Sequence, residues 1–211
     1  MEKVSKRQLE RYPIYLNYLL SLRESGVSFI SSPVMAKSLS LSEEQVRKDL
    51  QLVSSSDGKP KTGRDINELI NDIQKFLGYK SVTNAAVIGV GHLGKALMNY
   101  KGFSEFGLNI VCGFDVDPSL INTEINGKGI YSLYSLSSKI EQHNIKIAIL
   151  VTPKETAQGV ADMLVNAGIK AIWNFVPVHL NINQNVAVEN VNLASSLAIL
   201  EHSLNRKGDE K

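Results

Sequence analysis

Two kinds of hydrophobic pattern divide the chain near Gly78. Before this point, apolar residues recur at the three- and four-residue spacing that places them on one face of a helix. After it, short apolar runs of strand length alternate with amphipathic helical segments. Strands that alternate with helices predict a parallel sheet with right-handed crossovers. We therefore expect a helical domain over residues 1–78, a doubly wound α/β domain over residues 79–191, and a terminal segment over residues 192–211.

The helical part has the plan of a winged helix-turn-helix, in which helices are followed by a turn-rich loop and a further helix. Pro13 fits the first turn of the first helix, and Gly26 ends that helix. Ser42 and Gln45 form a capping-box pattern at the start of a later helix. The helix-turn-helix is therefore expected from about Pro13 to Leu52.

The second part contains near-continuous apolar runs, which are typical of strands covered on both faces. We expect strands at residues 85–90, 108–114, 145–151 and 171–174, with weaker candidates at 128–130 and 186–189. Helical patterns lie between them at residues 93–101, 132–142 and 155–167. A terminal helix over about residues 193–204 aligns Leu193, Leu197, Leu200 and Leu204.

A glycine pattern of the form GxGxxG joins the first of these strands to a helix: Gly89, Val90, Gly91, His92, Leu93 and Gly94. In this pattern the first glycine permits a tight turn, the second lets the backbone approach a pyrophosphate, and the third lets the helix pack close to the strand. Asp115 follows Gly94 by 21 residues, the offset expected of an acid that accepts ribose hydroxyls and repels a 2′-phosphate. The segment predicts an NAD(H) site that disfavours NADP(H). The alternative is a similar turn that binds another nucleotide or nothing.

Composition and charge narrow the remaining classes. The 211 residues carry a net charge of +2, so any basic surface for nucleic acid has to be local. The one cysteine, Cys112, excludes an intrachain disulfide and has no metal ligands at useful spacing. No apolar run approaches a membrane span, and the start of the chain does not read as a signal peptide, so we expect a cytoplasmic protein. Among the histidines, His179 alone lies near the carboxyl end of a predicted strand, and no catalytic pair accompanies it. We therefore expect no catalytic residues, and a cofactor that acts as a signal.

The candidate recognition helix begins after the Ser42 cap, and its N-terminal end is where such helices meet base edges. The candidate DNA contacts are Ser42, Gln45, Arg47 and Lys48 on this helix, with Lys59, Lys61 and Arg64 on the wing. The same helix also carries three acidic residues, Glu43, Glu44 and Asp49. On charge alone we therefore expect it to bind DNA only moderately well, because carboxylates repel phosphates. A helical module for dimer contacts is the alternative.

The order of these domains and several short motifs resembles the Rex family of bacterial redox-sensing transcriptional repressors. The matching stretches are residues 11–16, 45–50, 87–97, 99–103, 114–117, 168–178 and 188–191. The resemblance implies a homodimer whose terminal helices, with Leu193, Leu197 and Leu200, swap between subunits. It also implies that double-stranded operator DNA is held when NADH is scarce and released when NADH binds.

The resemblance also implies roles for single residues. Tyr100 matches a tyrosine near the nicotinamide, and Thr152 and Pro153 match the loop that faces the cofactor. Asn192 stands where family members often have an aspartate that could pair with that tyrosine or with an arginine of the DNA-binding domain. We predict that NADH binding persists but is more weakly coupled to DNA release. Residues 51–57 also lack the family's usual aromatic-glycine segment after the recognition helix.

Three functions are open on the sequence. The first is an NAD(H)-sensing repressor. The second is a divergent relative that keeps the sensor, binds DNA weakly and acts through protein contacts. The third is a small NAD-dependent oxidoreductase.

Overall fold

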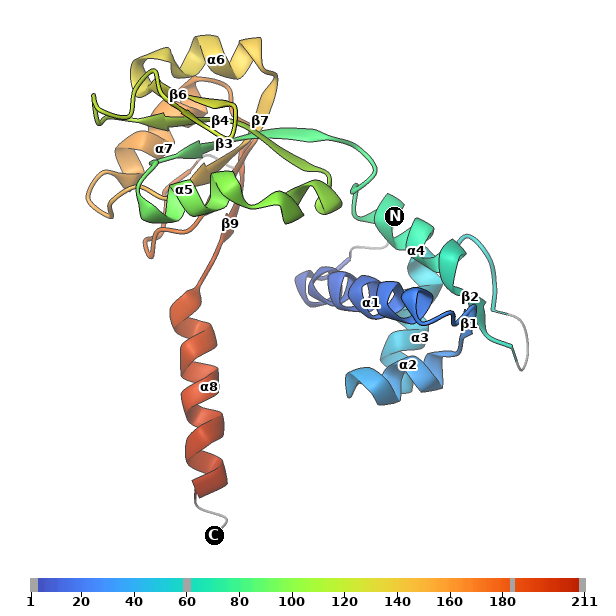
Figure 1. The fold of residues 1–211 in the computed structure, drawn as a ribbon. Helices are drawn as coiled ribbons and strands as arrows, with labels where there is room; N and C mark the ends of the chain where they lie inside the picture. The colour runs from blue at the N-terminus through green and yellow to red at the C-terminus, as the bar shows by residue number, and fades with distance from the viewer. Residues whose placement is uncertain (1–3, 59–61, 183–184, 209–211) are drawn as a thin grey trace. The chain divides into compact units, whose positions relative to one another are not determined.

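The computed structural model describes residues 4–58, 62–182 and 185–208. Residues 1–81 and 82–211 form two compact units. Figure 1 labels the elements of both. The first unit contains, in chain order, α1 (Lys6–Glu24), β1 (Phe29–Ile30), α2 (Ser32–Leu39), α3 (Glu43–Val53), β2 (Arg64–Asp65) and α4 (Ile66–Phe76).

The first unit is a winged helix around one apolar core. Side chains from its helices fill that core, among them Tyr12, Tyr15, Leu16, Leu19, Met35, Val46, Leu50, Ile66, Leu69 and Ile73. β1 and β2 pair antiparallel, with Phe29 opposite Asp65, and form the base of the wing. Lys59 and Lys61, which we placed on the wing, lie outside the described residues.

Capping side chains set where the helices begin. The Ser42 hydroxyl accepts a hydrogen bond from Gln45 N at 3.2 Å, so α3 starts at Glu43 as the capping pattern indicates. The Asp65 carboxylate accepts from the backbone of Asn67 and Glu68 and caps α4.

The start of α1 differs from our expectation. The helix begins at Lys6, because Ser5 and Gln8 form a reciprocal capping box that the periodicity did not reveal. Pro13 therefore lies inside the helix rather than in its first turn. The carbonyl that loses its helical donor belongs to Leu9, a residue at the exposed surface, where water can replace the missing N–H.

The second unit is a doubly wound α/β domain. Its strands are β3 (Thr83–Ile88), β4 (Leu108–Asp115), β5 (Glu124–Ile125), β6 (Lys128–Ser132), β7 (Ile145–Leu150), β8 (Ala171–Asn174) and β9 (Ala187–Asn190). Its helices are α5 (His92–Asn99), the 3-10 helices η1 (Lys101–Phe106) and η2 (Leu133–Ser135), α6 (Leu136–Gln142), α7 (Ala157–Asn166) and α8 (Leu193–Gly208). The sheet order is β5-β6-β4-β3-β7-β8-β9, parallel except for the β5–β6 hairpin.

Helices cover both faces of the central strands, which explains their continuous apolar runs. On one face, Leu136 and Ile140 of α6 pack with α7 over the side chains of Ile88 and Phe114. On the other face, Met98 of α5 packs over the opposite set of β3 and β4 side chains. Figure 1 shows α6 and α5 on opposite sides of the sheet. Cys112 lies fully buried in the α6–α7 layer, and burial raises the pKa of its thiol to about 12.

The buried side chain of Asn174, at the end of β8, anchors the segment that leads into α8. The Asn174 side chain donates to Asn190 Oδ1 at 2.8 Å and to the Val178 carbonyl at 3.1 Å. Asn192 Oδ1 then accepts from Ser195 N at 2.9 Å and caps α8. Along residues 193–205, every side chain is exposed in the single chain, including Leu193, Leu197, Ile199, Leu200 and Leu204.

Candidate functional site

A cavity of about 600 Å³ opens at the carboxyl ends of the central strands β3, β4 and β7. This edge is where ligands bind in open parallel sheets, because the crossover helices leave a crevice there. The lining residues are Gly89, Gly91, Phe114, Asp115, Val116, Leu133, Val151, Thr152, Pro153, Thr156 and Val160. The structure therefore brings Gly89, Gly91, Asp115, Thr152 and Pro153 together from segments that are distant in sequence.

A Cβ atom would have a different effect at each of the three glycines of the loop. Gly89 has φ +96°, and a Cβ there would lie 2.9 Å from the Val151 carbonyl oxygen of the neighbouring strand. A Cβ on Gly94 would lie 2.0 Å from the Gly89 oxygen, so only glycine lets α5 approach the loop. At Gly91, in contrast, a Cβ would meet no protein atom within 4 Å. Since the protein does not occupy that space, it is available to a ligand in the cavity.

Asp115 ends β4 with its carboxylate held by backbone donors. Oδ2 accepts from Val90 N at 2.5 Å, and Oδ1 accepts from Val116 N at 2.7 Å and Asp117 N at 2.9 Å. These bonds tie the acid to the glycine loop and fix its orientation. Each carboxylate oxygen has more than one lone pair, so the group can also accept hydroxyl donors from a ligand.

Thr152 supplies an unsatisfied polar atom in the cavity wall. Among the described residues, its Oγ1 is buried and has no hydrogen-bond partner. A buried hydroxyl without a partner costs free energy, which a polar ligand in the cavity would recover. The donors and acceptors of the cavity suit a nucleotide: loop backbone N–H groups for phosphate, Asp115 for sugar hydroxyls, and Thr152 for a further polar group.

The other candidate cofactor residues do not line the cavity. Val90 is buried and contributes its backbone N–H to Asp115. His92 and Leu93 are the exposed first residues of α5. Tyr100 follows the other end of α5, exposed, with its ring 4.8 Å from that of Phe103. The structure thus does not bring Tyr100 to the cavity that Gly89 and Asp115 line.

The charges of α3 are distributed differently from what the sequence suggested. Asp49 is 2% exposed and faces α1, so it does not belong to the outward face. Glu44 pairs with Lys48 at 2.7 Å, and both are exposed. The exposed face of α3 therefore carries two carboxylates rather than the three that the sequence indicated, because Asp49 is buried and paired with Arg11.

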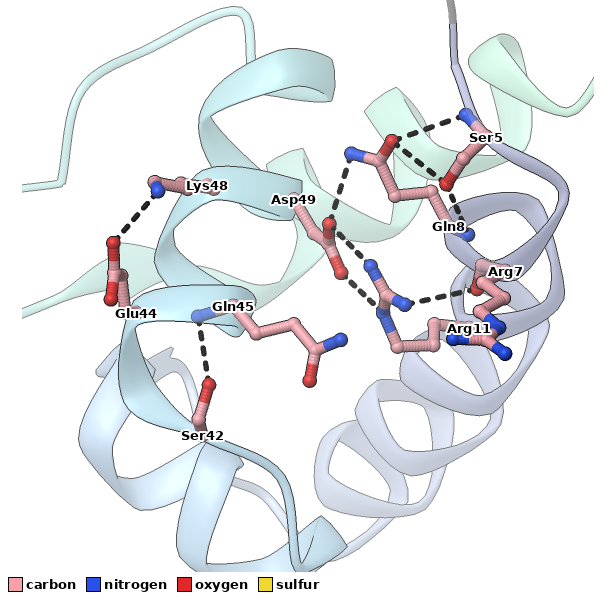
Figure 2. Close-up of a pocket in the computed structure, with 9 residues that line it drawn as sticks. All are labelled: Ser5, Arg7, Gln8, Arg11, Ser42, Glu44, Gln45, Lys48 and Asp49. Atoms are coloured by element: carbon pink, nitrogen blue, oxygen red, sulfur yellow. Dashed lines mark hydrogen bonds and ion pairs between the residues drawn. The ribbon is translucent and has the colours of Figure 1, made fainter.

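Four side chains of α1 surround Asp49, as Figure 2 shows for Gln8 and Arg11. Arg11 donates through Nε at 2.6 Å and through Nη2 at 2.8 Å, one bond to each carboxylate oxygen. Tyr15 donates to Oδ2 at 2.7 Å, Gln8 to Oδ1 at 3.1 Å, and Tyr12 to the Asp49 carbonyl at 3.0 Å. Burial raises the pKa of Asp49, but the bonds from Arg11, Tyr15 and Gln8 outweigh it and hold that pKa below its ordinary value. Burial, with Asp49 nearby, raises the pKa of Tyr12 to about 12.

The sequence contains a signal for this cluster, which is a single charge next to apolar positions on each of two helices. Arg11 lies one turn before Tyr15 on one helix, and Asp49 lies between Val46 and Leu50 on the other, so each charge adjoins apolar positions of its helix. A charge at a buried position needs a partner, so opposite charges at such positions on two helices predict an ion pair between them. Arg11 and Asp49 were the pair to propose.

The base of the wing and α3 enclose a hollow of about 370 Å³. Arg47 and Arg64 both line it, together with Ser31, Gln51 and Asp57. Arg64 also donates to the Ser56 carbonyl at 2.5 Å, which fixes its side chain along the wing.

Polar contacts hold the segment that lacks the family's aromatic-glycine residues. Ser55 donates to the Asp72 carboxylate through its backbone N–H at 2.7 Å and its hydroxyl at 2.8 Å, and the Ser56 hydroxyl donates to Glu68 at 3.0 Å. The segment is therefore anchored to α4 by hydrogen bonds.

In the described part of the chain, no three or more His, Cys, Asp or Glu side chains come together as metal ligands. None of the helices described has both the length and the apolar character needed to cross a bilayer.

Comparisons with known proteins agree with this architecture. A family model described as "Put_DNA-bind_N, Putative DNA-binding protein N-terminus" matches residues 3–51, and one described as "CoA binding domain" matches residues 80–178. The redox-sensing transcriptional repressor Rex of Bacteroides thetaiotaomicron is 38% identical over 203 residues, which are 96% of this chain and 92% of the relative. The chain belongs to the Rex family. The Rex repressor of Treponema denticola is 39% identical over 199 residues, 94% of each chain.

Solved Rex-family structures have the same fold over the whole chain. The crystal structure of RSP, a Rex-family repressor, in complex with beta-NAD+ and operator DNA matches with a TM-score of 0.91 and 36% identity, covering 99% of this chain and 95% of that one. The structure of RSP with beta-NADH matches with a TM-score of 0.89 and 35% identity, covering 99% and 97%. These findings confirm the resemblance to the Rex family and the fold class of a winged helix followed by a Rossmann domain.

Proposed function

We propose that this chain is an NAD(H)-responsive transcriptional repressor that holds operator DNA and releases it when NADH binds. The observation that carries the proposal is the cavity at the glycine loop, in a chain whose first unit is a winged helix. Gly91 leaves space for a ligand, Asp115 offers an oriented carboxylate, and Thr152 has a buried hydroxyl without a partner among the described residues. The Rex-family repressor RSP, whose crystal structures contain beta-NAD+ with operator DNA and beta-NADH, supports both ligands.

Four residues of the cavity have proposed parts in holding the dinucleotide. The loop backbone at Gly91 and the free N–H groups that begin α5 would face the pyrophosphate charge. Asp115 would accept ribose hydroxyls and would repel a 2′-phosphate, which favours NAD(H) over NADP(H). Thr152, with Pro153, would contact the cofactor from the β7 side. When bound, NAD(H) supplies a two-state nicotinamide whose charge and shape report the redox state.

We propose a sensor rather than a catalyst. The described residues of the cavity wall offer hydroxyls, one carboxylate and backbone groups, which hold a ligand. His179, the one histidine near the carboxyl end of a predicted strand, lines a different hollow, next to the start of α8. The curated relatives are named as repressors, not as oxidoreductases.

The proposed DNA contacts are Ser42, Gln45, Arg47 and Lys48 on α3, with Lys59, Lys61 and Arg64 on the wing. Arg47 and Arg64 line one hollow, which supports a surface shared by α3 and the wing. The proposed partner is a second copy of the chain. The exposed leucines Leu193, Leu197 and Leu200 of α8 need an apolar cover, and a swapped helix in a homodimer would supply it. We propose the cytoplasm as its location, since a repressor acts where operator DNA and the NAD(H) pool are.

The test is DNA binding titrated with each form of the cofactor separately. A duplex is first recovered from a random-sequence pool by selection with the wild-type protein. Linkage requires that NADH bind the released arrangement more tightly than the DNA-bound one. We therefore expect NADH to weaken binding of that duplex and NAD+ to preserve it. Equal effects of the two forms, or recovery of no duplex, would overturn the proposal.

A further inference from the structure

Asp49 is an unusual residue for a helix that approaches DNA, because its carboxylate would repel phosphates if it were exposed. The chain instead buries it against α1, where Arg11, Gln8, Tyr12 and Tyr15 contact it. We call these five residues the α1–α3 clasp. Asp49 is 34 to 41 residues from the other four in sequence, so the clasp is a tertiary contact between two helices.

The clasp connects α1 and α3 through side-chain hydrogen bonds and an ion pair. In the first unit, α1 packs chiefly on α4 and α2 packs chiefly on α3. Side chains that bridge α1 and α3 therefore act beside the packing of α3 on α2 and in the shared apolar core to set its orientation about its own axis. A paired guanidinium and carboxylate form two parallel bonds in one plane, which restrains orientation more than an apolar contact does.

The position of the clasp on α3 matters for DNA. Asp49 lies four residues after Gln45, so the two side chains occupy one helical face, one turn apart. Figure 2 shows Gln45 extending from α3 toward Arg11, between the two helices and below Asp49 in this view. Both Gln45 and Asp49 line a hollow of about 530 Å³ that Arg7 and Lys48 also border. A rotation of α3 that moved Asp49 would move Gln45, a proposed base contact, by a similar amount.

The clasp also reaches the start of the chain. Gln8 Nε2 donates to Asp49, while Gln8 Oε1 accepts from Ser5 N at 3.2 Å within the capping box of α1. One glutamine thus fixes the first turn of α1 and one oxygen of Asp49 together. Gln8 therefore links the N-terminal end of α1 to α3.

We propose that Arg11 and Asp49 are positioning residues for operator reading, which set the orientation of α3 and Gln45 and thereby the choice of DNA sequence. This inference rests on the proposed DNA-binding function. Stability alone does not account for the ion pair, because apolar residues of similar volume replace buried ion pairs in other proteins with little loss, or with a gain, of stability. What an apolar pair does not reproduce is the directional restraint.

The experiment uses the full-length chain and the double variant Arg11→Met with Asp49→Leu. This change keeps the net charge at +2 and leaves no buried charge unpaired. The affinities for the selected duplex and for a scrambled duplex of the same length are measured over a series of salt concentrations. Circular dichroism and thermal unfolding report the fold. Arg23→Met is the matched control for surface charge, because Arg23 is an exposed residue in the last turn of the same helix.

We expect the double variant to fold, to bind scrambled DNA like the wild type, and to keep the same salt dependence, which reports phosphate contacts. Its preference for the selected duplex should fall roughly tenfold, the loss expected when one side chain no longer reaches its base. Arg23→Met should keep the full preference. A stabilising role alone predicts wild-type preference in the folded double variant, and that result would overturn the inference.

A second variant covers failure of the double variant to fold. Arg11→Lys keeps the positive charge beside Asp49 but loses the two-bond geometry. We expect it to fold and to lose part of the preference, whereas undiminished preference would overturn the positioning role. If the wild type itself selects no duplex, the proposed function fails along with the inference. If the wild type selects a duplex and the variants select it equally well, only the inference fails.

Discussion

Substitution of Gly91 by alanine separates ligand binding from folding. Gly91 has φ −71°, a conformation that alanine adopts freely, and the added methyl group would meet no protein atom within 4 Å. Replacing glycine by alanine at a compatible position stabilises a protein by about 0.4–1 kcal/mol, because the unfolded chain loses conformational freedom. We therefore expect the thermal midpoint of Gly91→Ala to equal or slightly exceed that of the wild type.

The same methyl group should weaken NADH binding. It would occupy the space through which the loop backbone approaches the pyrophosphate. Loss of one hydrogen bond to a charged group costs about 1.5–3 kcal/mol, which corresponds to roughly a tenfold to hundredfold weaker affinity. Calorimetric titration with NADH measures the affinity, and thermal unfolding without ligand measures the fold.

Two variants bracket this result. Gly159→Ala adds the same methyl group at an exposed, unobstructed position of α7 and should leave NADH affinity unchanged. Gly94→Ala should lower stability as well as affinity, because its Cβ would collide with the Gly89 oxygen. Wild-type NADH affinity in folded Gly91→Ala would refute the placement of the pyrophosphate at this loop.

Four further predictions concern the other parts of the chain. Asp115→Asn removes the charge that repels a 2′-phosphate, so the ratio of NADPH to NADH dissociation constants should fall roughly tenfold, about one charge-assisted hydrogen bond; an unchanged ratio in paired titrations would contradict this role. The pKa of Asp49 is lowered in the folded protein, so its stabilising effect is complete above the ordinary aspartate value of about 4 and is lost as the pH falls through the lowered pKa. Asp49→Asn should accordingly be less stable than the wild type at neutral pH, and the gap should narrow below about pH 4; a gap that stays constant in acid unfolding would argue against the ion pair. Asn192→Asp should keep the α8 cap, since either side chain accepts from Ser195 N, and should strengthen the effect of NADH on binding of the selected duplex; equal NADH effects in the two proteins would rule out a coupling role for this residue. Leu197→Glu places a charge on the exposed apolar face of α8 and should shift the protein from the proposed dimer to a monomer in light scattering, since a buried leucine contributes about 1.5–3 kcal/mol; an unaltered mass would show that α8 is not the interface.

The periodic parts of the fold followed from the sequence. Continuous apolar runs marked β3, β4, β7 and β8 to within about two residues, because strands covered on both faces leave little room for polar residues. The start of α1 did not follow, because it depends on Ser5 and Gln8 rather than on hydrophobic spacing. The short strand β5 was not predicted either, because two residues, Glu124 and Ile125, are too few to show a hydrophobic pattern and are strand only through their pairing with β6.

The candidate site divides in the same way. The glycine loop and Asp115 form one local unit, so spacing alone predicted that they meet. Leu133 and Thr156 join the same cavity from elements that are far from the glycine loop in sequence, and no local pattern marked them as site residues. The outward charge of α3 was misjudged for a related reason. Whether Asp49 faces DNA or α1 depends on Arg11, a residue 38 positions away.

The burial of Cys112 decides which redox chemistry this protein can register directly. Peroxides and disulfides react with thiolates, and a thiol with a pKa of about 12 is almost entirely protonated at neutral pH. The sole sulfhydryl of the chain is thus shielded from oxidants by both packing and protonation. We therefore expect oxidative stress to reach this protein through the balance of reduced and oxidised nicotinamide rather than through Cys112.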